Sequence, residues 1–235
     1  MNLSTIHKEL KKYASKEKAE ILQRFFKTGP GEYGEGDIFL GVKVPETRAV
    51  AKKFKDLTLN DTISLLKSKI HEERLLALLI LVQKYSSGDS GTRKNVYTAY
   101  LKNTKYINNW DLVDLSAYKI VGEYLADKSK KPLYVLVRSQ NMWERRIAII
   151  STYKFIKSDD FEDTIKISRL LLNDDHDLIH KAVGWMLREV GKRDISVCEG
   201  FLKGCYRSMP RTMLRYAIER FPEGKRLKYL HGQIN

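Results

Sequence analysis

Apolar residues recur along almost the whole chain at the period of about 3.6 residues that is typical of an α-helix. Glycine and proline residues, among them Gly88, Pro132 and Pro210, interrupt this pattern and divide it into helices of ordinary length. One segment, LYVLV at 133–137, resembles a strand, but it directly follows Pro132 and continues into a helical pattern. We therefore expect a helix there and an all-α fold for the chain.

Five of the expected helices share one arrangement of residue types. Each begins with polar or charged turns, continues with a small residue and then presents a dense apolar face; they span residues 72–85, 109–125, 142–156, 177–191 and 210–221. The small residues, which lie 40, 31, 34 and 35 positions apart, are Ala77, Ala117, Ala148, Ala182 and Ala217. Second helices alternate with these, over 58–69, 93–103, 131–140, 160–174 and 195–208. A two-helix unit of this period is typical of a HEAT-like α-solenoid.

This repeat predicts one domain over residues 1–235, folded as a right-handed α-α superhelix, a solenoid of HEAT-like or ARM type. An irregular helical bundle is the alternative, because the repeats share little sequence identity. The concave face of a solenoid is lined by one helix of each pair. Here that face would be a basic groove with two tryptophans and one carboxylate, carrying Arg74, Trp110, Asp114, Arg145, Arg146, Lys154, His180, Lys181, Trp185, Arg188, Arg211 and Arg215.

Composition and charge narrow the class of protein. The chain is 43% hydrophobic and 31% charged, which excludes a disordered chain, and no apolar run approaches the roughly 20 residues of a membrane span. The charged N-terminus lacks the apolar core of a secretory signal, so we expect a cytoplasmic protein. The formal net charge of +14 suits a polyanionic partner, although a solvated basic surface would give the same charge. Two cysteines, Cys198 and Cys205, would lie about 10.5 Å apart on one helix, beyond disulfide reach.

Two further motifs point to loops and caps rather than to ligand sites. GPGEYGEG at 29–36 contains G-x-G-x-x-G, but it follows a helix and carries Glu32 and Glu35, where phosphate binding would favour a preceding strand and no negative charge. His176 and His180 have the spacing of a zinc pair, but no cysteine or histidine cluster completes the site. We expect Asp175 to cap a helix, and no metal or organic cofactor.

Trp110 and Asp114 lie one helical turn apart and therefore share a face. A tryptophan in the core beside a solvated aspartate is the ordinary explanation of such a pair. Trp185 favours a different explanation. Lys181 and Arg188 flank it on its helix, and exposed aromatics among basic residues suit stacking on nucleic acid. We expect Trp143, which starts its helix, in the core.

Four segments, in their order and spacing, carry a resemblance to a known family over most of the chain. They are FLGVKVPETR (39–48), NNWDLVD (108–114), MWERRIAIISTYKF (142–155) and HKAVGWMLREVGK (180–192). With these motifs the sequence resembles the AlkD-type DNA alkylation repair glycosylases, which are built of HEAT-like repeats. It departs from a relative at Phe25 and Phe26, where that relative has a tyrosine near the DNA, and at Arg145, where it has a neutral residue.

The resemblance implies a monofunctional DNA glycosylase of base excision repair, a hydrolase that removes cationic alkylated purines such as 7-methylguanine and 3-methyladenine from duplex DNA without flipping the base. It implies that Trp110, Asp114 and Trp185 form the catalytic set and that Arg146 holds the DNA backbone. Lys154, Arg188 and Arg48 match positions that contact DNA in relatives, and we add Arg145 and Lys181 from the basic face as DNA-binding residues. The expected protein is a monomer that associates with the nucleoid when bound to DNA.

The chemistry of such a lesion suits these residue types. Alkylation at N7 or N3 places a positive charge on the purine, so the base is already a good leaving group. A carboxylate such as Asp114 would stabilise the oxocarbenium-like sugar that forms and position a water. Each tryptophan face would add about 0.5–2 kcal/mol of cation–π attraction.

A second hypothesis needs no catalysis. Because a fold does not by itself fix a function, a basic HEAT-like solenoid could be a non-catalytic scaffold that binds DNA or an acidic protein. Tryptophans buried in the core and turned away from the basic groove would favour this scaffold.

Overall fold

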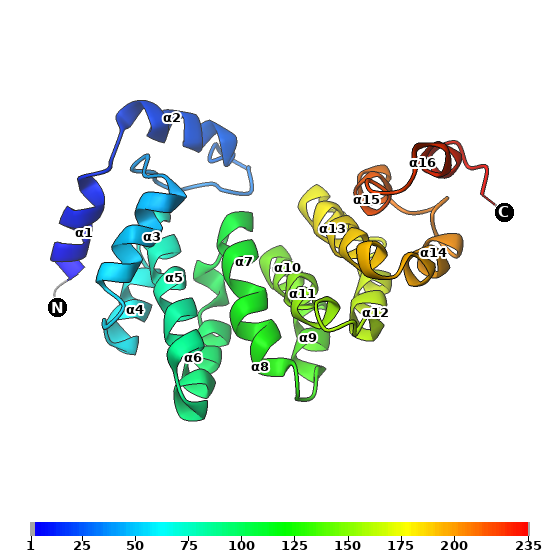
Figure 1. Ribbon diagram of the computed structural model, residues 1–235. Coiled ribbons are helices and arrows are strands. Elements are labelled where there is room, and N and C mark those ends of the chain that lie inside the picture. The colour runs from blue at the N-terminus through cyan, green and yellow to red at the C-terminus, as the bar shows by residue number, and fades with distance from the viewer. Residues whose placement is uncertain (1–2, 235) are drawn as a thin grey trace. The chain divides into compact units, whose positions relative to one another are not determined.

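The computed structural model describes residues 3–234, and within them it contains helices and no strand (Figure 1). This confirms the all-α expectation. The elements are α1 Leu3–Lys11, α2 Lys16–Phe25, α3 Val44–Lys53, α4 Leu59–Leu66, α5 His71–Ser87, α6 Ser90–Lys102, η1 Thr104–Tyr106, α7 Trp110–Ala117, η2 Tyr118–Gly122, α8 Glu123–Leu125, α9 Lys131–Leu136, α10 Met142–Ser151, α11 Tyr153–Ile156, α12 Glu162–Leu170, α13 Asp177–Arg193, α14 Ile195–Lys203, α15 Arg211–Ala217 and α16 Glu223–Leu230.

Helix α5 forms the centre of the first of two compact units, which spans Met1–Ser116. It packs against α3, α4 and α6 (Figure 1), and every residue from Leu75 to Leu81 is buried. A helix that is apolar on all sides, as LLALLIL is, becomes stable only when neighbours cover it completely. Its first turns are polar yet also buried, and they belong to the site described below.

Helix α13 has the same central place in the second unit, Ala117–Asn235, where it packs against α10, α12, α14 and α15. Gly184 allows the approach of α15, because a Cβ atom there would lie 2.5 Å from the carbonyl oxygen of Met213. The five repeated alanines, Ala77, Ala117, Ala148, Ala182 and Ala217, are at most 1% exposed. In this unit Gly184, two residues after Ala182 on the same helix, adds a further point of close approach.

The expected helices appear with local differences. Residues 133–137, which resemble a strand in sequence, lie mainly in α9, as expected. The segment 109–125 contains a π-helical stretch, η2, between α7 and α8. Such a stretch adds a residue to a turn and often accompanies functional sites. Helix α14 ends at Lys203, so Cys205 lies beyond the helix that holds Cys198, and both thiols are free.

One expected cap is wrong. His176, not Asp175, precedes the first residue of α13, and its Nδ1 accepts a hydrogen bond from the backbone N–H of Leu178. Asp174 instead accepts from the backbone N–H of His176, so two side chains share the turn before the helix. The solenoid, the basic groove and the single domain stay predictions. No helix in the described part of the chain is long and apolar enough to cross a membrane.

Candidate functional site

The start of α7 is fixed by side chains that come just before Trp110 and just after it. Asn109, which is fully buried, accepts a hydrogen bond on Oδ1 from the backbone N–H of Trp110 at 2.8 Å. Asp111 Oδ1 accepts one from the backbone N–H of Leu112 at 2.9 Å. These bonds satisfy backbone donors that the first turn of any helix leaves without partners. They fix the turn from which Trp110 and Asp114 project.

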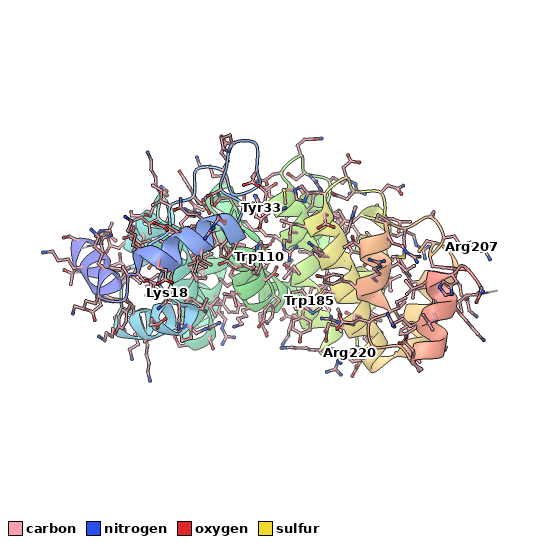
Figure 2. All side chains as sticks on the ribbon, turned by 90° about the horizontal axis from the view of Figure 1, so that it is seen from above. Lys18, Tyr33, Trp110, Trp185, Arg207 and Arg220 are labelled. Carbon is pink, nitrogen blue, oxygen red and sulfur yellow. The ribbon has the colours of Figure 1, made fainter. Side chains whose placement is uncertain are left out.

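Trp110 lies at one end of a stack of aromatic rings. Its ring is nearly parallel to that of Phe26, with centroids 5.2 Å apart and 21° between the planes. Phe26 in turn stacks on Phe39 at 5.1 Å and 17°, while Phe25 meets Trp110 edge-on at 6.0 Å. Offset and edge-on ring pairs contribute about 0.5–1.5 kcal/mol each beyond area burial. The indole is half-buried and has a defined orientation (Figure 2).

Trp110 and Asp114 both line a cavity of about 610 Å³. Most of its other lining is apolar or aromatic, including Phe25, Phe39 and Val44. Both residues are half-buried rather than sealed in the core, and the polar residues that share the lining with Asp114 include Lys18, Lys43 and Asp111. The structure brings this tryptophan and this aspartate to one cavity, which makes the cavity the default candidate site, and their joint action stays a prediction.

A buried polar network lies against the same cavity. His71 is 2% exposed, and its Nδ1 lies 2.9 Å from Asp37 Oδ2 while its Nε2 lies 2.8 Å from Asp111 Oδ2. Arg74 donates from Nη2 to Asp37 Oδ1 at 2.6 Å, and Asn109 donates from Nδ2 to Asp37 Oδ2 at 3.4 Å. Sequence reasoning missed this network, although HEER at the start of an apolar helix was a signal for it.

The network changes the ionisation of its members. Burial opposes the charged form of His71, but attraction by Asp111 and hydrogen bonds to Asp111 and Asp37 outweigh burial and raise the pKa of His71 to about 9. Burial likewise opposes ionisation of Asp37, yet the hydrogen bond from His71 and the charge of Arg74 lower its pKa below the ordinary value. At neutral pH the buried charges are therefore paired.

The segment FLGVKVP is attached to α5 by one buried carboxylate. Glu72 accepts hydrogen bonds from the backbone N–H groups of Leu40, Gly41 and Val42, at 2.8 to 3.2 Å. Gly41 has a positive φ of 80°, and a Cβ atom there would lie 2.1 Å from the carbonyl oxygen of Ser15, so only glycine fits. These contacts place Phe39 and Val42 along the cavity.

The glycine-rich segment 29–36 is a loop, as expected. Glu32 accepts a hydrogen bond from the backbone N–H of Gly29, and Glu35 accepts one from that of Gly31, both at 2.9 Å. The loop's own carboxylates thus bind amides that a phosphate would need.

In the second unit Trp185 projects from α13 and is half-buried (Figure 2). Its Nε1 donates to Glu189 Oε1 at 3.1 Å, and its ring lies 6.0 Å from that of Tyr153. Tyr153 meets Tyr118 edge-on at 5.2 Å, and the Lys157 ammonium lies 4.7 Å from the centroid of Tyr153. Trp185 therefore contacts one half-buried ring, Tyr153, which in turn contacts Tyr118 and the Lys157 ammonium. Trp143 is buried, as expected.

Most of the cations expected to bind DNA already contact carboxylates. Arg145 binds Asp174 with both Nε and Nη2, Lys154 lies 2.9 Å from Glu123, Lys181 lies 2.6 Å from Asp177, and Arg188 contacts Glu219. Only the Asp177–Lys181 pair, at i and i+4, could be read directly from spacing.

Arg146 and Arg48 differ from those four cations. Arg146 is only 4% exposed, and its Nη1 donates to the carbonyl oxygen of Leu178, at the start of α13. The Arg146 guanidinium therefore joins α10 to α13 in this structure. Arg48 on α3 is exposed. Contact of either side chain with a phosphate stays a prediction.

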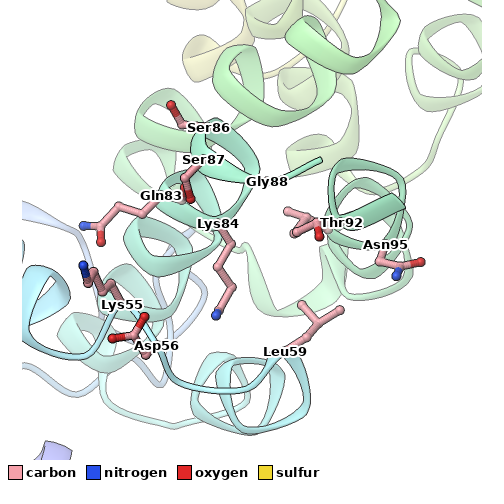
Figure 3. A pocket seen from close by; sticks show the side chains of 11 residues that line it. Lys55, Asp56, Leu59, Gln83, Lys84, Ser86, Ser87, Gly88, Thr92 and Asn95 are labelled. Carbon is pink, nitrogen blue, oxygen red and sulfur yellow. The ribbon is translucent and has the colours of Figure 1, made fainter. Parts of the chain in front are cut away.

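A second cavity, of about 660 Å³, lies in the first unit between α4, α5 and α6 (Figure 3). Lys55, Lys84 and Thr92 are among its polar lining residues, and none of the residues predicted to be functional lines it. Within residues 3–234 no group of three or more His, Cys, Asp or Glu side chains is arranged to hold a metal ion.

The sequence comparison and the structural comparison point to the same kind of protein. Residues 6–221 match the sequence model of a family described as DNA alkylation repair enzyme. The fold is similar to a solved structure described as a predicted DNA alkylation repair enzyme from Enterococcus faecalis, with a TM-score of 0.69 and 18% identity. That match covers 89% of this chain and 97% of the other. Among curated protein sequences, none matches.

Proposed function

The chain belongs to the family of DNA alkylation repair enzymes, and on that basis we propose that it is a glycosylase acting on cationic alkylated purines in duplex DNA. The substrates would be lesions such as 7-methylguanine and 3-methyladenine. The reaction would be hydrolysis of the N-glycosidic bond, without flipping of the damaged base. One observation carries this proposal: Trp110 and Asp114 share the lining of a largely apolar cavity, where a carboxylate and an indole face the same space.

The cavity suits the charge that develops as the bond breaks. Departure of a cationic purine leaves an oxocarbenium-like sugar, and a carboxylate already in place stabilises it without reorganisation. The apolar lining lowers the local dielectric, which strengthens the attraction of Asp114 for that sugar. Trp110 presents an aromatic ring to the same space, and Trp185 would provide the second indole. Asp114 would also orient the attacking water.

Backbone contacts would supply most of the affinity. Neutralising phosphates with lysine and arginine releases counterions, which makes binding strong and dependent on salt. We assign this role to Arg48, Arg145, Lys154, Lys181 and Arg188, with Arg146 beside the lesion. Because several of these cations contact carboxylates, phosphates would have to exchange for those partners.

Release of free base from a duplex containing one 7-methylguanine tests the proposal. Wild-type protein should release the base faster than spontaneous depurination. Asp114→Asn should lose most of the release while retaining duplex binding. Glu162→Gln is the control, because Glu162 is exposed, pairs with Lys166 and lies outside the predicted set. Binding to undamaged duplex without any release by wild type would support the non-catalytic scaffold instead.

A further inference from the structure

We propose that His71 is a positioning residue for this reaction, because it holds the first turn of α7 and the ring stack under Trp110 through hydrogen bonds to Asp37 and Asp111. The inference rests on the proposed function for its catalytic consequence. Its structural basis lies wholly within the first unit.

The hydrogen bonds determine how many protons His71 carries. An ionised carboxylate only accepts hydrogen bonds, so a ring nitrogen next to one must donate. Both nitrogens of His71 lie within 2.9 Å of a carboxylate oxygen, one from Asp37 and one from Asp111. With both carboxylates ionised, the ring must be an imidazolium with two N–H groups. Its raised pKa agrees with this geometry.

Two connections join the imidazolium to the candidate site. The first is covalent, because Asp111 follows Trp110 directly and precedes Asp114 by three residues on the same helix. The second is the ring stack: Phe39 lies on the imidazole at 4.4 Å and 22°, and Phe26 lies between Phe39 and Trp110. A shift of His71 would therefore reach Trp110 through the helix and through the rings.

Loss of the proton would disturb both connections. A neutral imidazole has one N–H, so one of the two carboxylates would face a lone pair instead of a donor. The buried cluster would also change from two cations and two anions to one cation and two anions, which is costly in a low-dielectric environment. Breaking the bond to Asp111 would release the side chain that holds the first turn of α7 against α5.

The charged groups around His71 come from several elements. Asp37 lies in the segment before α3, Asp111 and Asp114 lie on α7, and Arg74, Glu72 and Glu73 lie on α5 itself. Glu72 is engaged by backbone amides, and Glu73 lies 2.5 Å from His7 on α1. Lys18 and Lys43 line the same cavity as His71. Arg74 opposes protonation of His71, whereas the two aspartates favour it.

The experiment compares wild type with His71→Gln in single-turnover release of 7-methylguanine, corrected for spontaneous release, between pH 6.5 and 10. Wild-type release should fall as the pH passes about 9. His71→Gln should be slower at pH 7 by about tenfold, as expected for a misplaced catalytic group, and should lack the alkaline fall. Duplex affinity should stay within about twofold in both. His231→Gln, an exposed histidine, is the matched control.

A second measurement does not depend on activity. The ring resonances of His71, assigned by through-bond correlation in isotope-labelled protein, should titrate near pH 9 in wild type and at clearly lower pH in Asp111→Asn. If wild type releases the base and His71→Gln does so with the same rate and the same pH profile, the inference is overturned and the proposed function stands. Absence of release by wild type would overturn the proposed function, and the titration would still decide the charge of His71. If His71→Gln does not fold, titration near neutrality in wild type overturns the inference.

Discussion

The indole Nε1 of Trp185 donates to Glu189 Oε1, one turn further along the same helix. Trp110 and Asp114 have the same spacing on α7, so each of the two candidate tryptophans is followed by an acidic residue four positions later. The surroundings of the two carboxylates differ. Glu189 contacts two cations, with Lys192 at 2.7 Å and Arg188 at 3.6 Å. Asp114 lines a largely apolar cavity, whose polar lining residues include Lys18 and Lys43, and a carboxylate there can act on a developing positive charge.

We therefore expect Asp114→Asn to slow base release by about 100-fold or more, the loss typical of removing one electrostatic stabiliser. Glu162→Gln should change the rate by less than about threefold, because Glu162 is an exposed carboxylate paired with Lys166 and lies outside the predicted set. Single-turnover rates at saturating enzyme measure both. Equal losses in the two variants would contradict the assignment of Asp114.

The tryptophans should separate into functional and structural ones. Trp185→Ala should slow release by about twofold to thirtyfold, which corresponds to the loss of one cation–π contact, with little loss of thermal stability. Trp143→Ala removes a buried ring and should destabilise the fold by about 3–5 kcal/mol. Thermal denaturation and base release, measured on both variants, make the comparison. A Trp185→Ala protein as unstable as Trp143→Ala would place Trp185 in the core.

The charge of His71 should appear in the dependence of stability on pH. Its pKa is about 9 in the folded protein against an ordinary value of 6.5. The group therefore contributes its full stabilisation below about pH 6.5 and loses it as the pH rises through about 9, a difference of about 3 kcal/mol. Urea unfolding of wild type and His71→Gln from pH 6 to 10 measures it. The two curves should converge at high pH, and parallel curves would contradict a protonated His71.

Two glycines on neighbouring helices should respond oppositely to alanine. Gly184→Ala would place a methyl group 2.5 Å from both the Met213 carbonyl oxygen and Tyr216 Cβ, so we expect a loss of about 1–3 kcal/mol. Gly200→Ala on α14 would meet nothing within 4 Å and should stabilise by about 0.5–1 kcal/mol. Chemical unfolding of both variants tests the close approach of α13 and α15. A neutral Gly184→Ala would contradict it.

The exposed Arg48 offers a test of backbone contact. Arg48→Ala should weaken duplex binding equally for damaged and undamaged sequences and reduce the slope of log affinity against log salt by about 1. Lys166→Ala, which removes an exposed lysine paired with Glu162 and outside the predicted set, should leave the slope unchanged. Titrations at several salt concentrations measure both slopes. An unchanged slope in Arg48→Ala would remove Arg48 from the interface.

Local patterns were enough to predict the helices and the pairing of Trp110 with Asp114, because helical period and i, i+4 spacing act within one element. The cavity could not be predicted in the same way. Its aromatic lining comes from Phe26 and Phe39, far from α7 in the sequence, and their contact depends on how the segment before α3 folds over α5. Composition alone would place these phenylalanines in a core, not beside a carboxylate.

The buried ion pairs were also beyond local reasoning. His71 meets Asp111 across 40 residues, and Arg145 meets Asp174 across 29. A basic side chain in a sequence carries no sign of whether the fold will give it a carboxylate partner. The net charge of +14 therefore does not reveal that most of the predicted contact cations are paired with carboxylates.

Trp110 borders the cavity and stacks on neighbouring rings, so its fluorescence should respond to changes in the cavity. The three tryptophans differ in environment: one is buried, one is hydrogen-bonded to a glutamate, and one borders the cavity between phenylalanines. With Trp143→Phe and Trp185→Phe combined, all indole fluorescence would come from Trp110. Emission from that single ring would then follow entry of a lesion into the cavity in real time, on native DNA without any attached dye.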